Sequence, residues 1–268
     1  YAYGQQKIGW KNRPTTPGTL KENGWLIGYG MANGVFGAGK GSASVRALLN
    51  KEGKLTLECA VSDMGPGTTT SMTLIAATAM QMPIEKIKFK LGDSDLPPGP
   101  SQGGSGTTST VGSAVDLACT TLKQNLKDLA IKYAPAFSTL KSEALEVKNE
   151  MIAVVADPSI KIAVVDLLQL SPEKQIDLTI ASSGKTAEQL KFTSNSFSSH
   201  FVKLAVNPKD GAIKILQVVT TGDAGKIISP KTARSQMIGG VVGGIGKALT
   251  EQLEMDHVSG QIINASFG

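Results

Sequence analysis

The sequence predicts an α+β fold made of two related units, each an antiparallel or mixed sheet packed with helices. Apolar and polar residues alternate in paired stretches, as they do in β-hairpins that bury one face. Other stretches space apolar residues three or four apart, as amphipathic helices do. The order hairpin, Asp-x-Gly, helix occurs twice, with the Asp-x-Gly at 63–65 and at 223–225. Antiparallel hairpins with helices on one face favour α+β over a doubly wound fold.

Four parts are expected along the chain. Residues 1–24 hold prolines and glycines with little periodicity, which predicts an extended lead-in. A first α+β cofactor-binding unit at 25–135 is followed by connecting strands and a short helix at 136–190. A second α+β unit at 191–268 is incomplete at its C-terminus. Because the chain opens without Met and stops directly after a strand-like run, both ends are interpreted as cut from a longer polypeptide.

The first unit opens with a hairpin around the turn at 50–53, because apolar residues occupy every second position on both sides of it. An almost wholly apolar or small run then predicts a buried helix that Pro83 ends. A second, amphipathic helix ends before Pro135. The elements expected here are strands at 43–49, 55–61 and 87–91, a helix at 69–82, a loop at 92–106 and a helix from Val111 through Leu129.

The later elements include a final helix with five glycines among its apolar residues. Each glycine inside a helix costs roughly 1 kcal/mol against alanine, so the five need a reason. Two explanations stay open: close packing of this helix on a sheet or another helix, or room for a bulky cofactor. The elements expected are strands at 151–155, 160–165, 201–206 and 212–219, a short helix starting at 171–173 and the glycine-bearing helix at 231–253.

Composition excludes several classes of function. The 268 residues carry a net charge of +5, but Lys and Arg are scattered without basic runs or interleaved aromatics, so nucleic-acid binding is not expected. No run of about 18 apolar residues predicts a membrane span. Cys59 and Cys119 have no second Cys or His at metal spacing. We therefore predict no metal site, a buried Cys59 and a reducing compartment, the cytoplasm.

Two runs rich in Gly, Ser and Thr are the strongest functional signal. They lie at 63–70 and 103–113, each just before a predicted helix. Glycine lets a backbone approach a ligand, hydroxyls donate hydrogen bonds, and a helix N-terminus offers free N–H groups to an anion. Taken alone, the first run is equally well explained as a helix cap. Together the two runs favour one phosphate-bearing cofactor held from two sides.

Other motifs are better explained by structure than by chemistry. The run at 34–40 resembles a phosphate-binding loop, but Gly41 follows its Lys where Ser or Thr is needed, so a flexible loop is expected. His200 and His257 have no neighbours for a metal site or a nucleophile pair. The carboxylates of Asp93 and Asp95 fit an Asx-type turn better than an acid–base pair.

Five separated motifs, in order, give the chain a likeness over nearly its whole length. It resembles the molybdenum-binding subunit of the xanthine dehydrogenase and aldehyde oxidase family, most of all its bacterial aldehyde-oxidising branch. The motifs are GWLIGYGMA at 24–32, DMGPGT at 63–68, LGDSDLP at 91–97, the run at 103–115 and PKTARSQMIGG at 230–240.

The resemblance implies a molybdopterin cofactor with molybdenum, commonly the cytosine dinucleotide form in bacteria. Such proteins hydroxylate aldehydes or N-heterocycles with oxygen from water and pass electrons to iron–sulfur and FAD partner subunits. A periplasmic location through a partner subunit's signal is an alternative to the cytoplasm. The cofactor-binding residues that the resemblance implies are Met64, Gly65, Gly67, Thr68, Ser109, Thr110, Gly112, Ser113 and Gln236.

The sequence departs from the family at two points. Pro66 stands where Gln or Thr is usual, which removes one donor to the cofactor. The family's catalytic Glu lies in a Gly-Glu motif beyond residue 268, so no catalytic residue is assigned and the fragment alone is expected to be inactive. Two other functions stay open: a non-catalytic structural or binding module that retains the fold, and an unrelated nucleotide-phosphate binder.

Overall fold

A computed structural model describes residues 1–266, which form two compact units. The central unit comprises Gly37–Asn195 and Lys226–Pro230. The terminal unit comprises Tyr1–Phe36, Ser196–Gly225 and the described chain from Lys231 onward. This division differs from the predicted one, because strand β2 (Trp25–Gly37) joins the C-terminal third of the chain instead of the hairpin that follows it.

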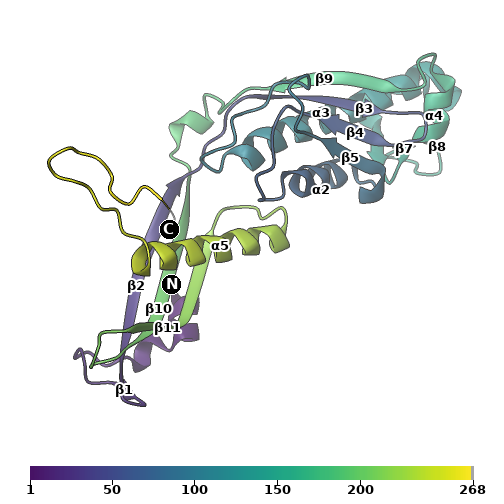
Figure 1. The fold of residues 1–268 in the computed structure, drawn as a ribbon. Helices are drawn as coiled ribbons and strands as arrows, with labels where there is room; N and C mark the ends of the chain where they lie inside the picture. Colours follow the sequence, from purple (N-terminus) through teal and green to yellow (C-terminus); the bar gives the residue numbers. More distant parts are fainter. Residues whose placement is uncertain (267–268) are drawn as a thin grey trace. The chain divides into compact units, whose positions relative to one another are not determined.

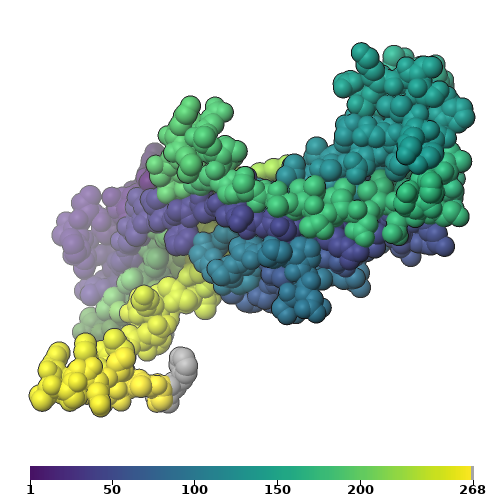
Figure 2. All heavy atoms as spheres, turned by 90° about the horizontal axis from the view of Figure 1, so that it is seen from above, coloured from purple at the N-terminus to yellow at the C-terminus, as the bar shows by residue number. Residues whose placement is uncertain are grey.

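The central unit is built on a four-stranded mixed sheet (Figure 1). Its strand order is β5-β4-β3-β9. Strand β3 pairs antiparallel with β4 and β9, whereas β4 pairs parallel with β5. In Figure 2 the segment of β9, in green, lies alongside that of β3, in dark blue. The strands are β3 (Ala43–Leu49), β4 (Leu55–Glu58), β5 (Ile87–Lys90) and β9 (Ile176–Ser182).

Two helices pack on the buried face of this sheet. Strand β3 alternates between buried and half-buried residues, as the hairpin pattern predicts. Its buried residues join those of α2 (Thr68–Met80) and α3 (Thr107–Tyr133) in one core. Helix α2 forms the crossover that the parallel pair β4–β5 requires. The predicted hairpin, both helices and the strand at 87–91 are therefore confirmed, with ends that differ by a few residues.

A three-stranded antiparallel sheet completes the central unit. It comprises β6 (Leu145–Lys148), β7 (Met151–Val154) and β8 (Lys161–Ala163). The strand predicted at 160–165 is confirmed as β8, although it ends two residues early because helix α4 (Val164–Leu170) follows directly. The helix predicted to start at 171 is wrong. Short 3₁₀ turns link the elements at η2 (Ile84–Lys86), η3 (Pro135–Phe137), η4 (Ser142–Ala144) and η5 (Gln189–Lys191).

The terminal unit has a sheet of order β1-β2-β10-β11. The predicted extended lead-in is corrected here, because the chain starts with a helix that packs on this sheet. A Cβ on Gly4 would lie 2.5 Å from the ring of Phe201, and Trp10 meets the same ring edge-on at 5.5 Å. The elements are α1 (Ala2–Ile8), η1 (Trp10–Asn12), β1 (Lys21–Glu22), β2 (Trp25–Gly37), β10 (Asn195–Val206) and β11 (Ile213–Asp223).

Helix α5 (Pro230–Leu249) in the terminal unit ends four residues before the predicted Leu253. It has no buried residue within the described chain. No described atom lies within 4 Å of a Cβ built on Gly239, Gly240, Gly243 or Gly244. Close packing within the described part of the terminal unit therefore does not account for these glycines. Residues 250–266, yellow in Figure 2, are almost all exposed.

The predicted recurrence of hairpin, Asp-x-Gly and helix is present in both units. Asp63 accepts a hydrogen bond from the Gly65 N–H at 3.0 Å, and Asp223 accepts one from the Gly225 N–H at 3.0 Å. Each of these Asx turns follows an antiparallel hairpin and precedes a helix. The neighbouring strands differ, so the likeness is local.

No described helix is long and apolar enough to cross a membrane.

Candidate functional site

The two predicted Gly/Ser/Thr runs meet at one edge of the central sheet. Strands β4 and β5 are parallel, so the loops that leave their carboxyl ends emerge side by side. Backbone hydrogen bonds join these loops: the Ala60 N–H donates to the Pro97 carbonyl at 2.7 Å, and the Gly92 N–H donates to the Val61 carbonyl at 2.8 Å. Helices α2 and α3 both start from these loops (Figure 1).

The starts of α2 and α3 also touch. A Cβ on Gly112, in the second turn of α3, would lie 2.7 Å from Ile75 Cδ1 and 3.9 Å from Met72 Cε on α2. Gly112 therefore lies where α3 packs against α2, and its contact with a cofactor stays a prediction. The packing of α3 on α2 and the paired strands β4 and β5 place the two helices at the same end of the sheet, and we call the segments 63–68 and 107–113, where the helices start, the paired helix starts.

The start of α2 already holds an anion of its own. The Asp63 carboxylate accepts hydrogen bonds from the N–H groups of Gly65 and Gly67, at 3.0 and 3.2 Å. Partial burial works to raise the pKa of Asp63, but the N–H groups of residues 65 and 67–69 outweigh it, so the pKa lies below its ordinary value. An external anion would have to compete with this carboxylate.

Around Asp63 the other predicted residues divide by exposure. Thr68, the first residue of α2, is buried. Met64 is 69% exposed, and Gly65 has φ +115° with nothing within 4 Å of a built Cβ in the described chain. This backbone is open to a ligand and takes a conformation that favours glycine.

The start of α3 differs because no described side chain caps it. Its N-cap residue is Gly106, which has no side chain to accept the free N–H groups of the first turn. Thr108 and Ser109 in that turn are exposed. A long helix with an uncapped, exposed N-terminus carries partial positive charge, which suits a phosphate.

The predicted hydroxyls of α3 bind the chain itself. Thr110 is 2% exposed, and its Oγ1 accepts a hydrogen bond from the Gly41 N–H at 3.0 Å. The Ser109 hydroxyl lies within hydrogen-bonding distance of the carbonyls of Gly39 and Gly106. Ser113 donates to the Ser109 carbonyl at 2.7 Å. These contacts hold the segment 39–41 against α3, which the sequence did not reveal.

Gln102, which sequence reasoning missed, lies in the loop before α3. Its Oε1 accepts a hydrogen bond from the Thr107 hydroxyl at 3.2 Å. Its Nε2 is buried and has no partner among residues 1–266. Its position directly before the second Gly/Ser/Thr run was the one available signal.

Gln236 lies on α5 in the terminal unit and is exposed. Its contact with a cofactor stays a prediction.

The predicted Asx turn at 93–95 is confirmed, because Asp93 accepts a hydrogen bond from the Asp95 N–H at 2.9 Å. The run at 34–40 is partly wrong as a loop, since β2 extends through Gly37.

The remaining titratable residues of interest are structural. His200 contacts Ser198 Oγ through Nε2 at 2.9 Å and Thr220 Oγ1 through Nδ1 at 3.0 Å, so it joins two strands. Both cysteines are free and buried, and burial raises the pKa of Cys59 to about 11. No cluster of three His, Cys, Asp or Glu that could hold a metal occurs in the described part of the chain.

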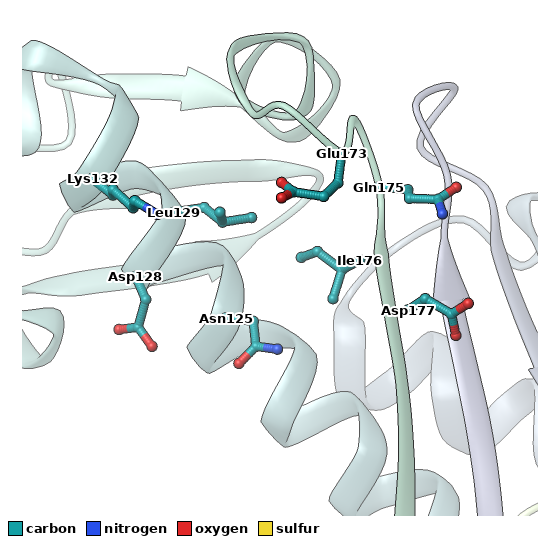
Figure 3. A pocket seen from close by; sticks show the side chains of 8 residues that line it. All are labelled: Asn125, Asp128, Leu129, Lys132, Glu173, Gln175, Ile176 and Asp177. Carbon is teal, nitrogen blue, oxygen red and sulfur yellow. The ribbon is translucent and has the colours of Figure 1, made fainter.

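A shallow cavity of about 410 Å³ lies elsewhere in the central unit, between α3 and the start of β9 (Figure 3). Figure 3 shows Leu129 of α3 and Ile176 of β9 between the charged side chains that line it. Asn125 on this rim is about 27 Å along the helix from Thr107 at 1.5 Å per residue. The cavity is therefore separate from the paired helix starts.

Comparisons with known proteins point to one family. A family model described as a molybdopterin cofactor-binding domain matches residues 3–268. The aldehyde oxidoreductase molybdenum-binding subunit PaoC of Escherichia coli K12 is 29% identical over 261 residues, which are 97% of this chain and 34% of that protein. The 6-hydroxypseudooxynicotine dehydrogenase complex subunit gamma of Paenarthrobacter nicotinovorans is 26% identical, over 92% of this chain and 31% of that protein. The chain thus spans about a third of the length of the curated relatives it matches.

Solved structures share the fold. Quinoline 2-oxidoreductase from Pseudomonas putida 86 matches with a TM-score of 0.77 and 17% identity, over 98% of this chain and 34% of that chain. CO dehydrogenase from Oligotropha carboxidovorans matches with a TM-score of 0.76 and 20% identity, over 99% of this chain and 33% of that chain. The α+β prediction is therefore confirmed.

Proposed function

The chain belongs to the family of molybdopterin cofactor-binding domains, and from that membership we propose that it forms the molybdopterin-binding part of a molybdenum hydroxylase. The protein that carries it would oxidise an aldehyde or an N-heterocycle with oxygen from water. The observation that supports this most is the uncapped start of α3, at the same end of the sheet as the loop with the open backbone of residues 64–65.

The residues present fit such a cofactor. A dinucleotide form carries a pyrophosphate, and the first-turn N–H groups of α3 are donors without a side-chain cap in the described chain. A pterin ring has many donors and acceptors, which backbone groups near Gly65 and the exposed hydroxyls of Thr108 and Ser109 can meet. Buried Gln102 Nε2 is a further donor in need of an acceptor.

The division of labour differs between the two helix starts. The α3 start would bind the pyrophosphate, because no side chain in the described part of the chain caps its positive end, whereas Asp63 accepts hydrogen bonds at the α2 start. Asp63 would hold the loop 63–67 in shape, so that Met64 and Gly65 lie along the cofactor. Thr110 and Gly112 would act through the scaffold, since both contact the chain itself. When bound, the cofactor would supply the redox centre at which the substrate is hydroxylated.

Partners follow from the same proposal. The names of two relatives describe them as a molybdenum-binding subunit and as a subunit of a complex. We therefore propose that iron–sulfur and FAD subunits accept the electrons, that the cofactor is the cytosine dinucleotide form, and that the protein works in the cytoplasm. Gln236 is proposed as an amide that contacts the cofactor from the terminal unit.

One matched pair of variants tests the proposal in the whole protein that carries this chain. Thr108 and Thr69 are each the second residue of their helix, and both are exposed. An aspartate at this position favours the helix itself, so the fold should survive both changes. Thr108→Asp should lower the molybdenum and cytidine monophosphate released per polypeptide by about tenfold, the effect of about 1.4 kcal/mol. Thr69→Asp should leave both near wild type.

The outcomes separate the alternatives. Wild-type protein with neither molybdenum nor cytidine monophosphate would overturn the proposal and favour a non-catalytic module. Equal losses in both variants would place the anion site away from the α3 start.

A further inference from the structure

The loop before α3 has an unsatisfied polar group at its centre. Gln102 Nε2 is the one buried side-chain nitrogen or oxygen atom among residues 1–266 that has no hydrogen-bond partner. The amide has two polar ends, and the Thr107 hydroxyl satisfies one of them. Whichever end faces Thr107, the other stays unpaired, and a buried unpaired polar group destabilises the fold that contains it.

The position of this amide links it to the α3 start. Oε1 and Nε2 share one carbon, and Oε1 is bound to the first residue of α3, so Nε2 also lies beside that helix end. The residues on both sides of Gln102 are exposed, as are Gly104 and Ser105 after them. Gln102 itself is half-buried, so its buried donor belongs to a loop that is otherwise exposed and that leads into the uncapped N-terminus.

We propose that Gln102 is a cofactor-positioning residue whose Nε2 donates a hydrogen bond to an acceptor oxygen of the anionic group at the α3 start. This inference rests on the proposed function, because that group is the pyrophosphate of the cofactor. The loop without cofactor is one hydrogen bond short, and the cofactor completes it. Oε1 keeps its bond to Thr107, which fixes the direction of the amide.

This role predicts that removing the amide has opposite effects on the stability of the cofactor-free protein and on the retention of the cofactor. Gln102→Met keeps the length of the side chain and removes both polar ends. It should leave the thermal midpoint of the cofactor-free protein unchanged or raise it, because an unpaired donor disappears. It should shrink the rise in midpoint on cofactor loading and speed cofactor release about tenfold, since a hydrogen bond to a charged group is lost.

A second variant keeps the Thr107 bond. Gln102→Glu can still accept from that hydroxyl, and its charge is tolerated beside a helix N-terminus. It replaces the donor with an anion that repels phosphate, so release should be faster than in Gln102→Met. The matched control is Gln175→Glu, the same change at an exposed position beside the distant cavity, which should release cofactor at the wild-type rate.

The experiment uses the whole protein that carries this chain, made with cofactor and in cells that cannot make it. Molybdenum and pterin released during gel filtration and thermal midpoints are measured for all four proteins. If both Gln102 variants release cofactor like Gln175→Glu, or if Gln102→Met lowers the cofactor-free midpoint as much as the loaded one, the inference is wrong although the proposed function stands. A wild-type protein without cofactor would overturn both.

Discussion

Thr110 Oγ1 accepts a hydrogen bond from the backbone N–H of Gly41 at 3.0 Å, which ties the segment before β3 to the first turn of α3. The Thr110 side chain is buried, so this oxygen serves the scaffold. A residue expected to hold a cofactor directly therefore holds the helix start in place.

We predict that Thr110→Val lowers the free energy of unfolding by about 0.5–1.5 kcal/mol, the net contribution of one hydrogen bond, because Gly41 is exposed and its N–H can bind water instead. Valine keeps the shape of threonine and removes the acceptor for Gly41. Thr110→Ser keeps the hydroxyl and serves as the control, with a smaller loss. Urea denaturation of the three proteins measures the difference, and equal stabilities of the Val and Ser variants would contradict the role assigned to this hydrogen bond.

The paired helix starts show how far sequence reasoning reaches. Gly, Ser and Thr before an apolar run predict a helix start, since cap and turn chemistry is local. Which hydroxyls remain free for a ligand depends on long-range pairing. Ser109 meets Gly39, and Thr110 meets Gly41, about 70 residues earlier in the chain. No local pattern marks such contacts, so the sequence predicts the segment but not which of its hydroxyls bind the chain itself.

The same distinction explains the errors in the fold. The β3–β4 hairpin was predicted because its alternation and turn lie within one short stretch. Helix α1 was missed because it packs on Phe201, a residue far along the chain, and only a glycine at position 4 leaves room for that ring. Strand β9 was missed because what holds it is pairing with β3, at Ala43 with Ser182 and onward. Packing partners far along the chain decided both elements.

Asp63 should stabilise α2 in a pH-dependent way. Its pKa is lowered in the folded protein, so its contribution is full above the unfolded pKa of about 3.9 and is lost as the pH falls through the folded value. Asp63→Ala should cost about 1 kcal/mol at neutral pH, as the loss of a helix cap does, and less at acid pH. Asp93→Ala, an Asx turn outside a helix start, is the control and should cost less.

Circular dichroism of thermal unfolding between neutral pH and about pH 3 measures these differences across the titration range of a carboxylate. A gap between wild type and Asp63→Ala that stays constant down to the lowest pH would show that the charge of Asp63 does not stabilise α2.

Glu58 is a buried carboxylate shared by two cations. It is 6% exposed and pairs with Lys90 at 2.7 Å and with Arg46 at 3.1 Å. The hydrogen bond from Lys90 is the largest influence on the pKa of Glu58. It outweighs the effect of burial, so this pKa lies below its ordinary value. Its contribution is therefore present above the unfolded pKa of about 4.3 and disappears as the pH falls through the folded value.

We predict that Glu58→Gln destabilises the protein by about 1–2 kcal/mol at neutral pH, less than a fully buried pair would, because both cations are partly exposed. The loss should begin to shrink as the pH falls below the unfolded pKa of about 4.3, and it should disappear once the pH is below the lowered pKa of the folded protein. Asp177→Asn, which affects the more exposed partner of Arg46, is the comparison and should cost less. Denaturant titrations at several pH values measure the free energy of unfolding of both variants. A larger loss for Asp177→Asn than for Glu58→Gln would contradict the prediction.

Gly112 offers a test in which the effect of one substitution on stability depends on the neighbouring residue Ile75. Alanine suits a helix interior better than glycine by about 1 kcal/mol, but a Cβ here would lie 2.7 Å from Ile75 Cδ1. Overpacking of this kind costs about 1–3 kcal/mol, so Gly112→Ala should be neutral to destabilising in the wild-type background. Ile75→Val removes Cδ1 and leaves the added methyl group about the space it needs. In that background Gly112→Ala should be stabilising by about 1 kcal/mol, as helix propensity alone requires. A double-mutant cycle by denaturation measures the coupling, and an equal effect of Gly112→Ala in both backgrounds would mean that contact with Ile75 is not the reason for glycine at this position.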